Sequence, residues 1–144
     1  MGEILHAGLI ALYRAGVWRG VLIEGPSGAG KSDLALRALG LGFRLVADDR
    51  VTLWTSGGRL FGAAPASLAG LIEVRGLGVV PAPRRAFAEV RLVIQCADDA
   101  PERIPDAQTR VLSGIACPMV SLRPLEASAP QKLVAALSLL GCAP

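Results

Sequence analysis

The stretch that most constrains the fold of this chain is Gly25-Pro26-Ser27-Gly28-Ala29-Gly30-Lys31-Ser32, which follows the apolar run 20–24. It matches the phosphate-binding pattern G-x-x-x-x-G-K-[ST] at every fixed position. Its glycines allow successive backbone N–H groups to point into one concavity, and the following helix adds its positive end there. We therefore expect a polyphosphate site in which Lys31 reaches the phosphates and the Ser32 hydroxyl ligates Mg²⁺. A glycine-rich turn that fits by chance is the alternative, which the flanking strand and helix patterns disfavour.

The sequence around this loop predicts a β-α-β unit. An apolar strand precedes the loop, a helix is expected over 31–39 with its end at Gly40 and Gly42, and a second strand follows over 43–47. The strands of such a unit are parallel, so their carboxyl ends lie at the same edge of the sheet. Asp48 or Asp49, directly after the second strand, is therefore expected beside the phosphate loop.

The two adjacent acids are candidates for phosphate chemistry. An acid at this position can ligate a metal ion or accept a proton near the attacking group. Neighbours on an extended segment point to opposite sides, so we expect one of the two to face the site. The other would cap a turn or hold a residue that contacts the site. A solvated Asp-Asp turn is the alternative.

Beyond residue 50 the pattern becomes rich in strands. A hairpin is expected over 51–54 and 60–63, and a short strand over 71–74 places Glu73 either outward or toward a metal ion. We expect an exposed loop at 81–85, a polar loop at 98–106 and a helix at 128–140 with Pro130 in its first turn. Further strands are expected at 89–96 and 119–122.

Composition indicates one domain, 1–144, of a globular protein. Hydrophobic residues make up 52% of the chain and charged residues 19%. The apolar run 133–144 is too short to span a membrane and Arg14 interrupts the first apolar stretch, so we expect a cytoplasmic protein. The net charge is +3, but the arginines are dispersed and aromatic residues are few, which argues against nucleic-acid binding. Three cysteines without C-x-x-C spacing indicate neither disulfides nor a zinc site.

Three segments in register resemble the catalytic domain of HPr kinase/phosphorylase, a bacterial family that phosphorylates a serine of the phosphocarrier protein HPr. They are the phosphate loop continued by Asp33, the strand Phe43-Arg44-Leu45-Val46-Ala47 with Asp48-Asp49-Arg50-Val51, and Ile72-Glu73-Val74-Arg75-Gly76-Leu77-Gly78-Val79. The resemblance covers nearly the whole chain. It implies a P-loop α/β fold of the PEP-carboxykinase-like type, with a mixed, β-rich sheet and a C-terminal helix.

The resemblance also assigns roles to individual residues. The catalytic aspartate of the family falls on Asp48, its magnesium-binding glutamate on Glu73 and its metal-ligating serine on Ser32. Its active-site histidine falls on His6, the single histidine of the chain, and its catalytic arginine on Arg103.

The regulatory domain of long family members is not in this sequence, which resembles the short proteobacterial forms. Met119 stands where the dephosphorylation segment of the family commonly carries a basic residue, so the reverse phosphorylase activity is left open. The resemblance implies a hexamer. The apolar excess of the final helix predicts a homo-oligomer with subunit contacts over 129–140.

The function expected from the sequence is that of a Mg-ATP-dependent protein serine kinase acting on HPr or an HPr-like carrier. One alternative is a small-molecule kinase, although no arginine-rich lid is recognisable. Another is a regulatory module that binds ATP and a partner without transferring phosphate.

Overall fold

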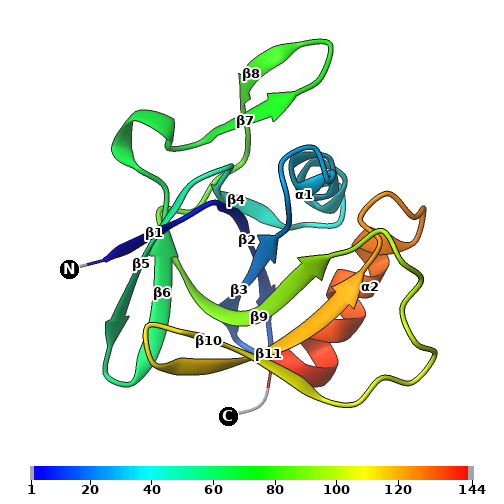
Figure 1. The fold of residues 1–144 in the computed structure, drawn as a ribbon. Coiled ribbons are helices and arrows are strands. Elements are labelled where there is room, and N and C mark those ends of the chain that lie inside the picture. Colours follow the sequence, from blue (N-terminus) through cyan, green and yellow to red (C-terminus); the bar gives the residue numbers. More distant parts are fainter. Residues whose placement is uncertain (1, 143–144) are drawn as a thin grey trace.

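A mixed β-sheet forms the body of the protein (Figure 1). The computed structural model describes residues 2–142, and within them nine strands make one sheet in the order β1-β5-β6-β9-β3-β2-β4, with β11 beside β9 and β10 beside β11. The strands are β1 Glu3–Leu5, β2 Ala7–Arg14, β3 Val17–Glu24, β4 Arg44–Ala47, β5 Val51–Ser56, β6 Arg59–Ala63, β9 Ala88–Cys96, β10 Gln108–Leu112 and β11 Ile115–Leu122. A separate two-stranded sheet contains β7 Leu71–Val74 and β8 Gly78–Pro81.

Strands β2 and β3 form a long hairpin that the sequence did not predict. They pair antiparallel from Ala7↔Glu24 to Arg14↔Val17. Only Ala15 and Gly16 lie between them, at φ 49° and 84°, as two-residue hairpin turns require. The connection is therefore two residues long, and the strand before the phosphate loop begins at Val17, three residues before the apolar run 20–24.

The predicted β-α-β unit is present, with one strand inserted. Strand β2 is antiparallel both to β3 and to β4, so β3 and β4 run in the same direction with β2 between them. Helix α1, Lys31–Leu39, connects them. The carboxyl ends of β3 and β4 and the start of β2 consequently lie at one edge of the sheet.

Strand β9 is the centre of the sheet. It pairs in parallel with β3, while its other edge is shared by β6 near its start and by β11 near its end. The prediction of a strand at 89–96 is confirmed. Strand β11 begins four residues before the predicted 119–122, and β10 was not predicted.

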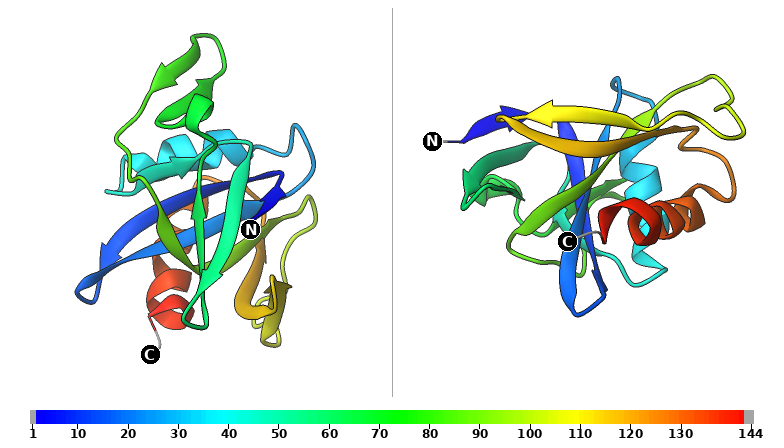
Figure 2. Two further views of the ribbon diagram at one scale, coloured as in Figure 1. Left: turned by 90° about the vertical axis from the view of Figure 1, so that its left-hand side faces the viewer. Right: turned by 90° about the horizontal axis from the view of Figure 1, so that it is seen from below.

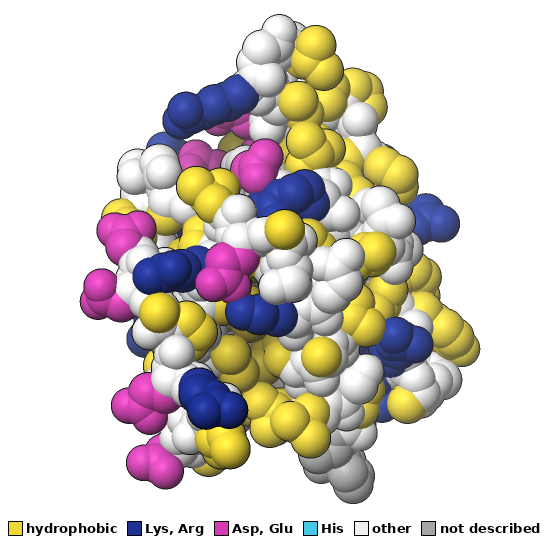
Figure 3. Space-filling model, turned by 90° about the vertical axis from the view of Figure 1, so that its right-hand side faces the viewer, with side chains coloured by type: hydrophobic (Ala, Val, Ile, Leu, Met, Phe, Trp, Pro, Cys, Tyr) yellow, Lys and Arg dark blue, Asp and Glu magenta, His cyan; other side chains and the backbone are white. Residues whose placement is uncertain are grey.

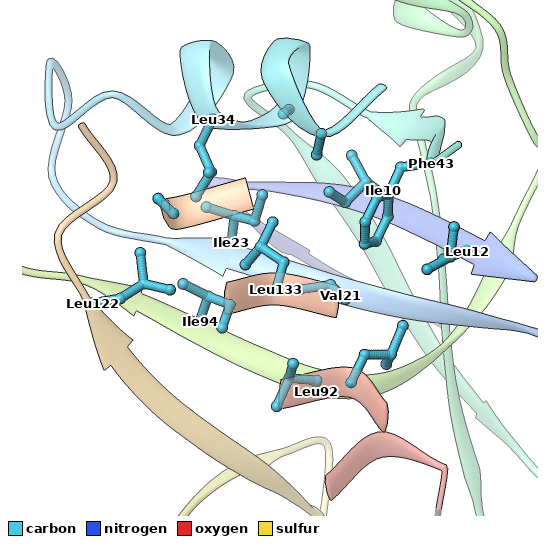
Figure 4. Close-up of a cluster of buried hydrophobic side chains, with 14 of the residues drawn as sticks. Ile10, Leu12, Val21, Ile23, Leu34, Phe43, Leu92, Ile94, Leu122 and Leu133 are labelled. Carbon is cyan, nitrogen blue, oxygen red and sulfur yellow. The ribbon is translucent and has the colours of Figure 1, made fainter. Parts of the chain in front are cut away.

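Both faces of the sheet are covered, which explains its continuous apolar strands. Val21 and Ile23 pack with Leu34 of α1 and Leu133 of α2 on one face, as Figure 4 shows. Leu22 joins a second core cluster on the other face, beneath β5, β6 and β10.

The β7–β8 hairpin projects beyond α1 (Figures 1 and 2). Ile72 is buried in the core, whereas Leu77 and Val79 are exposed. Figure 3 shows hydrophobic side chains gathered over this hairpin, while basic and acidic side chains are mixed lower on the same face.

The final helical segment is close to its prediction. Helix α2 spans Ala129–Ala136 with a proline in its first turn, and a π-helical turn continues it over Leu137–Gly141. Leu133 and Leu137 are buried, but Leu139 is 79% exposed. No helix in the described part of the chain is long and apolar enough to cross a membrane.

Candidate active site

The glycine-rich loop connects β3 to the first residue of α1. Gly28 and Gly30 have φ of 80° and 104°, a backbone region that favours glycine. A Cβ atom at Gly30 would also lie 2.8 Å from the Leu125 side chain. Glycine at position 30 is thus required both by the backbone turn and by the close approach of Leu125.

Lys31 lies within the curve of this loop. Its side chain is nearly buried, and Nζ donates hydrogen bonds to the carbonyl oxygens of Gly25 at 2.7 Å and Pro26 at 3.0 Å. None of the ion pairs among the described residues includes Lys31. Its charge is held by neutral carbonyl groups only, so it can bind an incoming phosphate without breaking a salt bridge.

Asp48 connects three elements of the site. The Ser32 hydroxyl donates a hydrogen bond of 2.7 Å to Asp48 Oδ1, and the Glu73 backbone N–H donates one of 2.9 Å to Asp48 Oδ2. The expectation that an acid after β4 lies beside the phosphate loop is confirmed. The same carboxylate fixes β7, and with it Glu73, against that loop.

Asp49 points to a different neighbour. Its Oδ1 lies 3.1 Å from His6 Nε2, and both side chains are about half exposed. Asp49 has φ 69°, a conformation in which Asp is tolerated better than most residues. His6 precedes β2, which starts at the edge where β4 ends, so the strand order itself brings His6 and Asp49 together.

These groups surround a cavity of about 490 Å³, which we call the phosphate cavity. Its lining comprises His6, Ser27, Gly28, Gly30, Lys31, Ser32, Asp33, Leu36, Asp49, Glu73, Val74, Arg75 and Leu125. Asp48 is not part of this lining, but it accepts hydrogen bonds from two residues that are, Ser32 and Glu73. Gly25, Pro26 and Ala29 belong to the loop without being part of the lining.

Arg75 was not singled out in the sequence, although it lines the cavity. Arg75 is the first residue of the turn after β7, so strand alternation does not place it on the side of Glu73. Its closeness to Glu73 in the sequence was the available signal. Arg103 does not line the cavity; it is exposed in the loop between β9 and β10.

The oxygen atoms of the cavity suit a hard cation. Mg²⁺ takes hydroxyl and carboxylate oxygens and is usually held by one or two protein groups together with phosphates and water. Ser32 and Glu73 offer one oxygen group each, and the Asp48 carboxylate holds both in place. Within residues 2–142, no group of three or more His, Cys, Asp and Glu side chains could hold a metal ion alone. The site therefore suits a metal ion that takes some of its ligands from Ser32 and Glu73 and the others from a bound phosphate and water.

An ion pair between β10 and β3 braces the start of the loop. Arg110 of β10 donates from Nε and Nη2 to the two carboxylate oxygens of Glu24, at 2.9 and 3.0 Å, at the residue before the loop begins. The hydrogen bond to Glu24 raises the pKa of the Arg110 guanidinium above its ordinary value. Glu24 is buried, so this two-point contact fixes the end of β3.

The segment 123–128 lies over the start of α1. Arg37 of α1 pairs with Asp33 and donates hydrogen bonds to the carbonyl oxygens of Pro124 and Glu126. Lys132 donates a hydrogen bond of 2.6 Å to Glu126 and lowers the pKa of that carboxyl group. Leu125 is thereby held, 69% exposed, at the mouth of the cavity.

The thiols of Cys96 and Cys117 are unsuited to nucleophilic chemistry. Burial raises the pKa of Cys96 to about 11, and burial also raises the pKa of Cys117. Both thiols therefore stay protonated at neutral pH, and the thiolate is the reactive form.

The sheet and this cavity define a class: a mixed α/β protein with a glycine-rich loop between strand and helix, and acidic and basic side chains converging above it. The particular family follows from sequence comparison. The profile of the HPr Serine kinase C-terminal domain matches residues 2–95, and the chain belongs to that family.

Individual relatives agree with this membership. An HPr kinase/phosphorylase of Clostridium tetani is 46% identical over 79 residues, 55% of this chain and 25% of that protein. An HPr kinase/phosphorylase of Lacticaseibacillus casei is 31% identical over 131 residues, 82% of this chain and 40% of that protein. The chain thus spans less than half the length of these relatives.

A solved structure shares the fold. It is described as the Hpr(Ser) kinase/phosphatase from Coxiella burnetii, with a TM-score of 0.79, 25% identity and coverage of 95% of each chain. The predicted β-rich α/β fold with a C-terminal helix is confirmed by this likeness.

Proposed function

We propose that this chain is a Mg-ATP-dependent protein serine kinase that phosphorylates HPr or an HPr-like carrier. One observation carries the proposal. A single carboxylate, Asp48, receives hydrogen bonds from the Ser32 hydroxyl of the phosphate loop and from the Glu73 amide of β7, and so gathers three chemically suited groups at one cavity. The C. tetani and L. casei relatives, which carry the name HPr kinase/phosphorylase, support it.

ATP would bind with its phosphates in the loop 25–32. Backbone N–H groups of the loop and the amino end of α1 would face the phosphates, and Lys31 would leave the Gly25 and Pro26 carbonyl groups to contact them. Ser32 and Glu73 would hold Mg²⁺, which when bound neutralises charge on the phosphates.

The chemical step needs a proton acceptor for the target serine. Asp48 would take the hydroxyl proton of that serine while its oxygen attacks the terminal phosphorus and the bond to the leaving ADP breaks. In the reverse direction, the protonated Asp48 would return the proton to the departing serine oxygen. Asp49 is the competing candidate for this role, because it lines the cavity and Asp48 is not part of the lining.

Charge on the transferred group requires a cation. Arg103 is the residue that the family resemblance assigns, and it would have to move from its exposed loop. Arg75 already lines the cavity. His6 would orient Asp49 through their contact of 3.1 Å.

Assembly into a homo-oligomer, of six subunits by the resemblance, belongs to the same proposal. Leu139 at the end of the chain's final helical segment is largely exposed and would lie in the subunit contact over 129–140. Light scattering of the purified protein tests this, and a monomer over a wide concentration range contradicts it.

The kinase proposal is tested by incubating the chain with ATP, Mg²⁺ and purified HPr and searching HPr for phosphoserine by mass spectrometry. A matched control uses HPr with the target serine replaced by alanine. Phosphoserine on the first protein only is the expected result. ATP binding without transfer to HPr would support the regulatory module, and transfer to a small acceptor would support the small-molecule kinase.

A further inference from the structure

A second pocket lies at the opposite end of β3 from the phosphate loop. It has a volume of about 590 Å³ and is lined by Tyr13, Gly16, Val17, Trp18, Arg19, Arg59, Phe61, Arg85, Phe87, Ala88, Glu89 and Arg91. We call it the arginine pocket. At about 3.3 Å per residue, the eight residues of β3 separate the two pockets by about 23 Å.

Aromatic rings form part of the lining of the arginine pocket, and we call them the aromatic floor. Tyr13 and Trp18 meet edge to face with ring centres 5.7 Å apart. Phe61 and Phe87 are 6.2 Å apart, and Trp54 stacks on Phe61 at 6.0 Å. Tyr13 and Phe87 are each about half exposed, so this floor offers flat apolar area to a ligand.

The charged side chains that line the pocket carry an excess of positive charge. Its charged side chains are four arginines and one glutamate, and that glutamate, Glu89, already pairs with Arg91 at 3.4 Å. In the described part of the chain, no ion pair includes Arg19, Arg59 or Arg85. The pocket therefore concentrates charge equal to the net charge of the whole chain, +3.

Two of these arginines are held in place although no carboxylate among residues 2–142 binds them. Arg19 is 8% exposed and donates hydrogen bonds to the backbone carbonyls of Arg14 and Gly141. The Arg85 guanidinium lies 4.6 Å above the Trp18 ring. Among residues 2–142, Arg85 Nε is buried and has no hydrogen-bond partner. A buried donor without a partner is unusual and calls for an acceptor.

We propose that the arginine pocket binds a small organic phosphate, with its phosphate group among the guanidinium groups and its body on the aromatic floor. Guanidinium groups match phosphate oxygens with paired N–H donors, and rings suit a planar or apolar body. Such an ester could be a mononucleotide or a sugar phosphate, which share this chemistry. The site is separate from the proposed kinase site and does not depend on that proposal.

Tryptophan emission reports this pocket selectively. The chain has two tryptophans: Trp18 lines the arginine pocket and Trp54 stacks beside it, whereas the phosphate cavity has none in its lining. A Lys31→Ala, Trp54→Phe protein removes the phosphate-loop lysine and leaves Trp18 as the fluorophore. It would be titrated with AMP, glucose 6-phosphate, inorganic phosphate, adenosine and glucose.

A saturable change of Trp18 emission with AMP or glucose 6-phosphate is the expected result, and the phosphate-free parents should give none. A response to AMP identifies the ligand as a mononucleotide, and a response to glucose 6-phosphate identifies it as a sugar phosphate. Arg59→Ala should weaken binding at least tenfold, because it removes one of the guanidinium groups that line the pocket. Arg59 is exposed, so the substitution leaves the core intact. Arg44→Ala, an exposed arginine at the start of β4, should leave affinity unchanged.

Three outcomes overturn the proposal. The first is the absence of a saturable response to either ester. The second is inorganic phosphate binding as tightly as the esters, which leaves the aromatic floor without a role. The third is self-association in sedimentation velocity that Arg59→Ala and Phe87→Ala both abolish, because the pocket would then be a contact between copies of this chain.

Discussion

The two ends of strand β3 offer two different physical means of binding an anion. At the carboxyl end, the proposed cradle consists of backbone N–H groups of the loop 25–32, and Lys31 adds one cation. At the amino end, the arginine pocket uses side chains alone, with guanidinium groups above aromatic rings. Backbone cradles depend on the local conformation of one segment, whereas the arginine pocket depends on the packing of several distant segments.

Charge separates the two ends further. The phosphate cavity mixes Lys31 and Arg75 with acids, as a site that holds both a metal ion and phosphates must. The arginine pocket has one acid, which is already paired. A chemical step is therefore expected only at the carboxyl end, and binding alone at the other. The predictions below test that division.

The largest effect is expected from Lys31→Ala. Loss of the phosphate contact should lower HPr phosphorylation on the order of a hundredfold or more, with the fold retained because Nζ bonds only to two loop carbonyls. Phosphoserine formation and circular dichroism measure the two effects. Arg59→Ala is the matched control at the other end of β3. An equal loss of activity in this variant would contradict the assignment of the chemical step to the carboxyl end alone.

Asp48→Asn should separate binding from chemistry. The amide keeps size and one acceptor but cannot take a proton, so phosphorylation should fall roughly a hundredfold while ATP affinity changes little. Asp49→Asn should be the milder change. Single-turnover rates and ATP titrations of both variants give the comparison, and the reverse order would assign the base to Asp49, which lines the cavity.

Gly20→Ala should disturb both ends at once, because Gly20 lies within β3. An added Cβ would lie 2.5 Å from the Glu89 backbone oxygen, and such overpacking typically costs about 1 to 3 kcal/mol, or a Tm lower by about 3 to 10 °C. Thermal unfolding measures it. Gly8→Ala on β2 is the control, since its Cβ would lie 3.7 Å from the nearest atom. Equal Tm values for the two variants would show that the β9 backbone moves aside to accommodate the added methyl group.

The smallest effect is expected at the hairpin turn beside the arginine pocket. Ala15 has φ 49°, so Ala15→Gly should remove backbone strain and raise the free energy of unfolding by about 0.5 to 1 kcal/mol. Denaturant unfolding checks this. Ala86→Gly, where φ is not positive, should lower stability slightly, and a gain at both positions would contradict the explanation by strain.

The sequence predicted the carboxyl end of β3 well because its signals are local. The loop 25–32, the helix at 31–39 and the acid pair after β4 follow one another within 25 residues. The common direction of β3 and β4, which lie on either side of β2, brings Asp48 to Ser32. The family resemblance and the fold class are confirmed as well. The individual catalytic roles remain predictions.

Other parts had no local signal. The run 7–12 is apolar on both faces, so it shows no period that separates a strand from a buried helix. Strand β10 is a short and mostly exposed edge strand. The arginine pocket collects residues between positions 13 and 91, and only the assembled sheet brings them together.

The position of β2 between β3 and β4 has a consequence for folding. Ser32 and Asp48 cannot meet until a strand that begins near residue 7 has been placed between their two strands, and β3 must also pair with β9, some seventy residues later in the chain. Contacts of this sequence separation are entropically costly to close and form slowly. A nascent or partly unfolded chain therefore lacks the phosphate cavity, and ligand binding reports completion of the whole sheet.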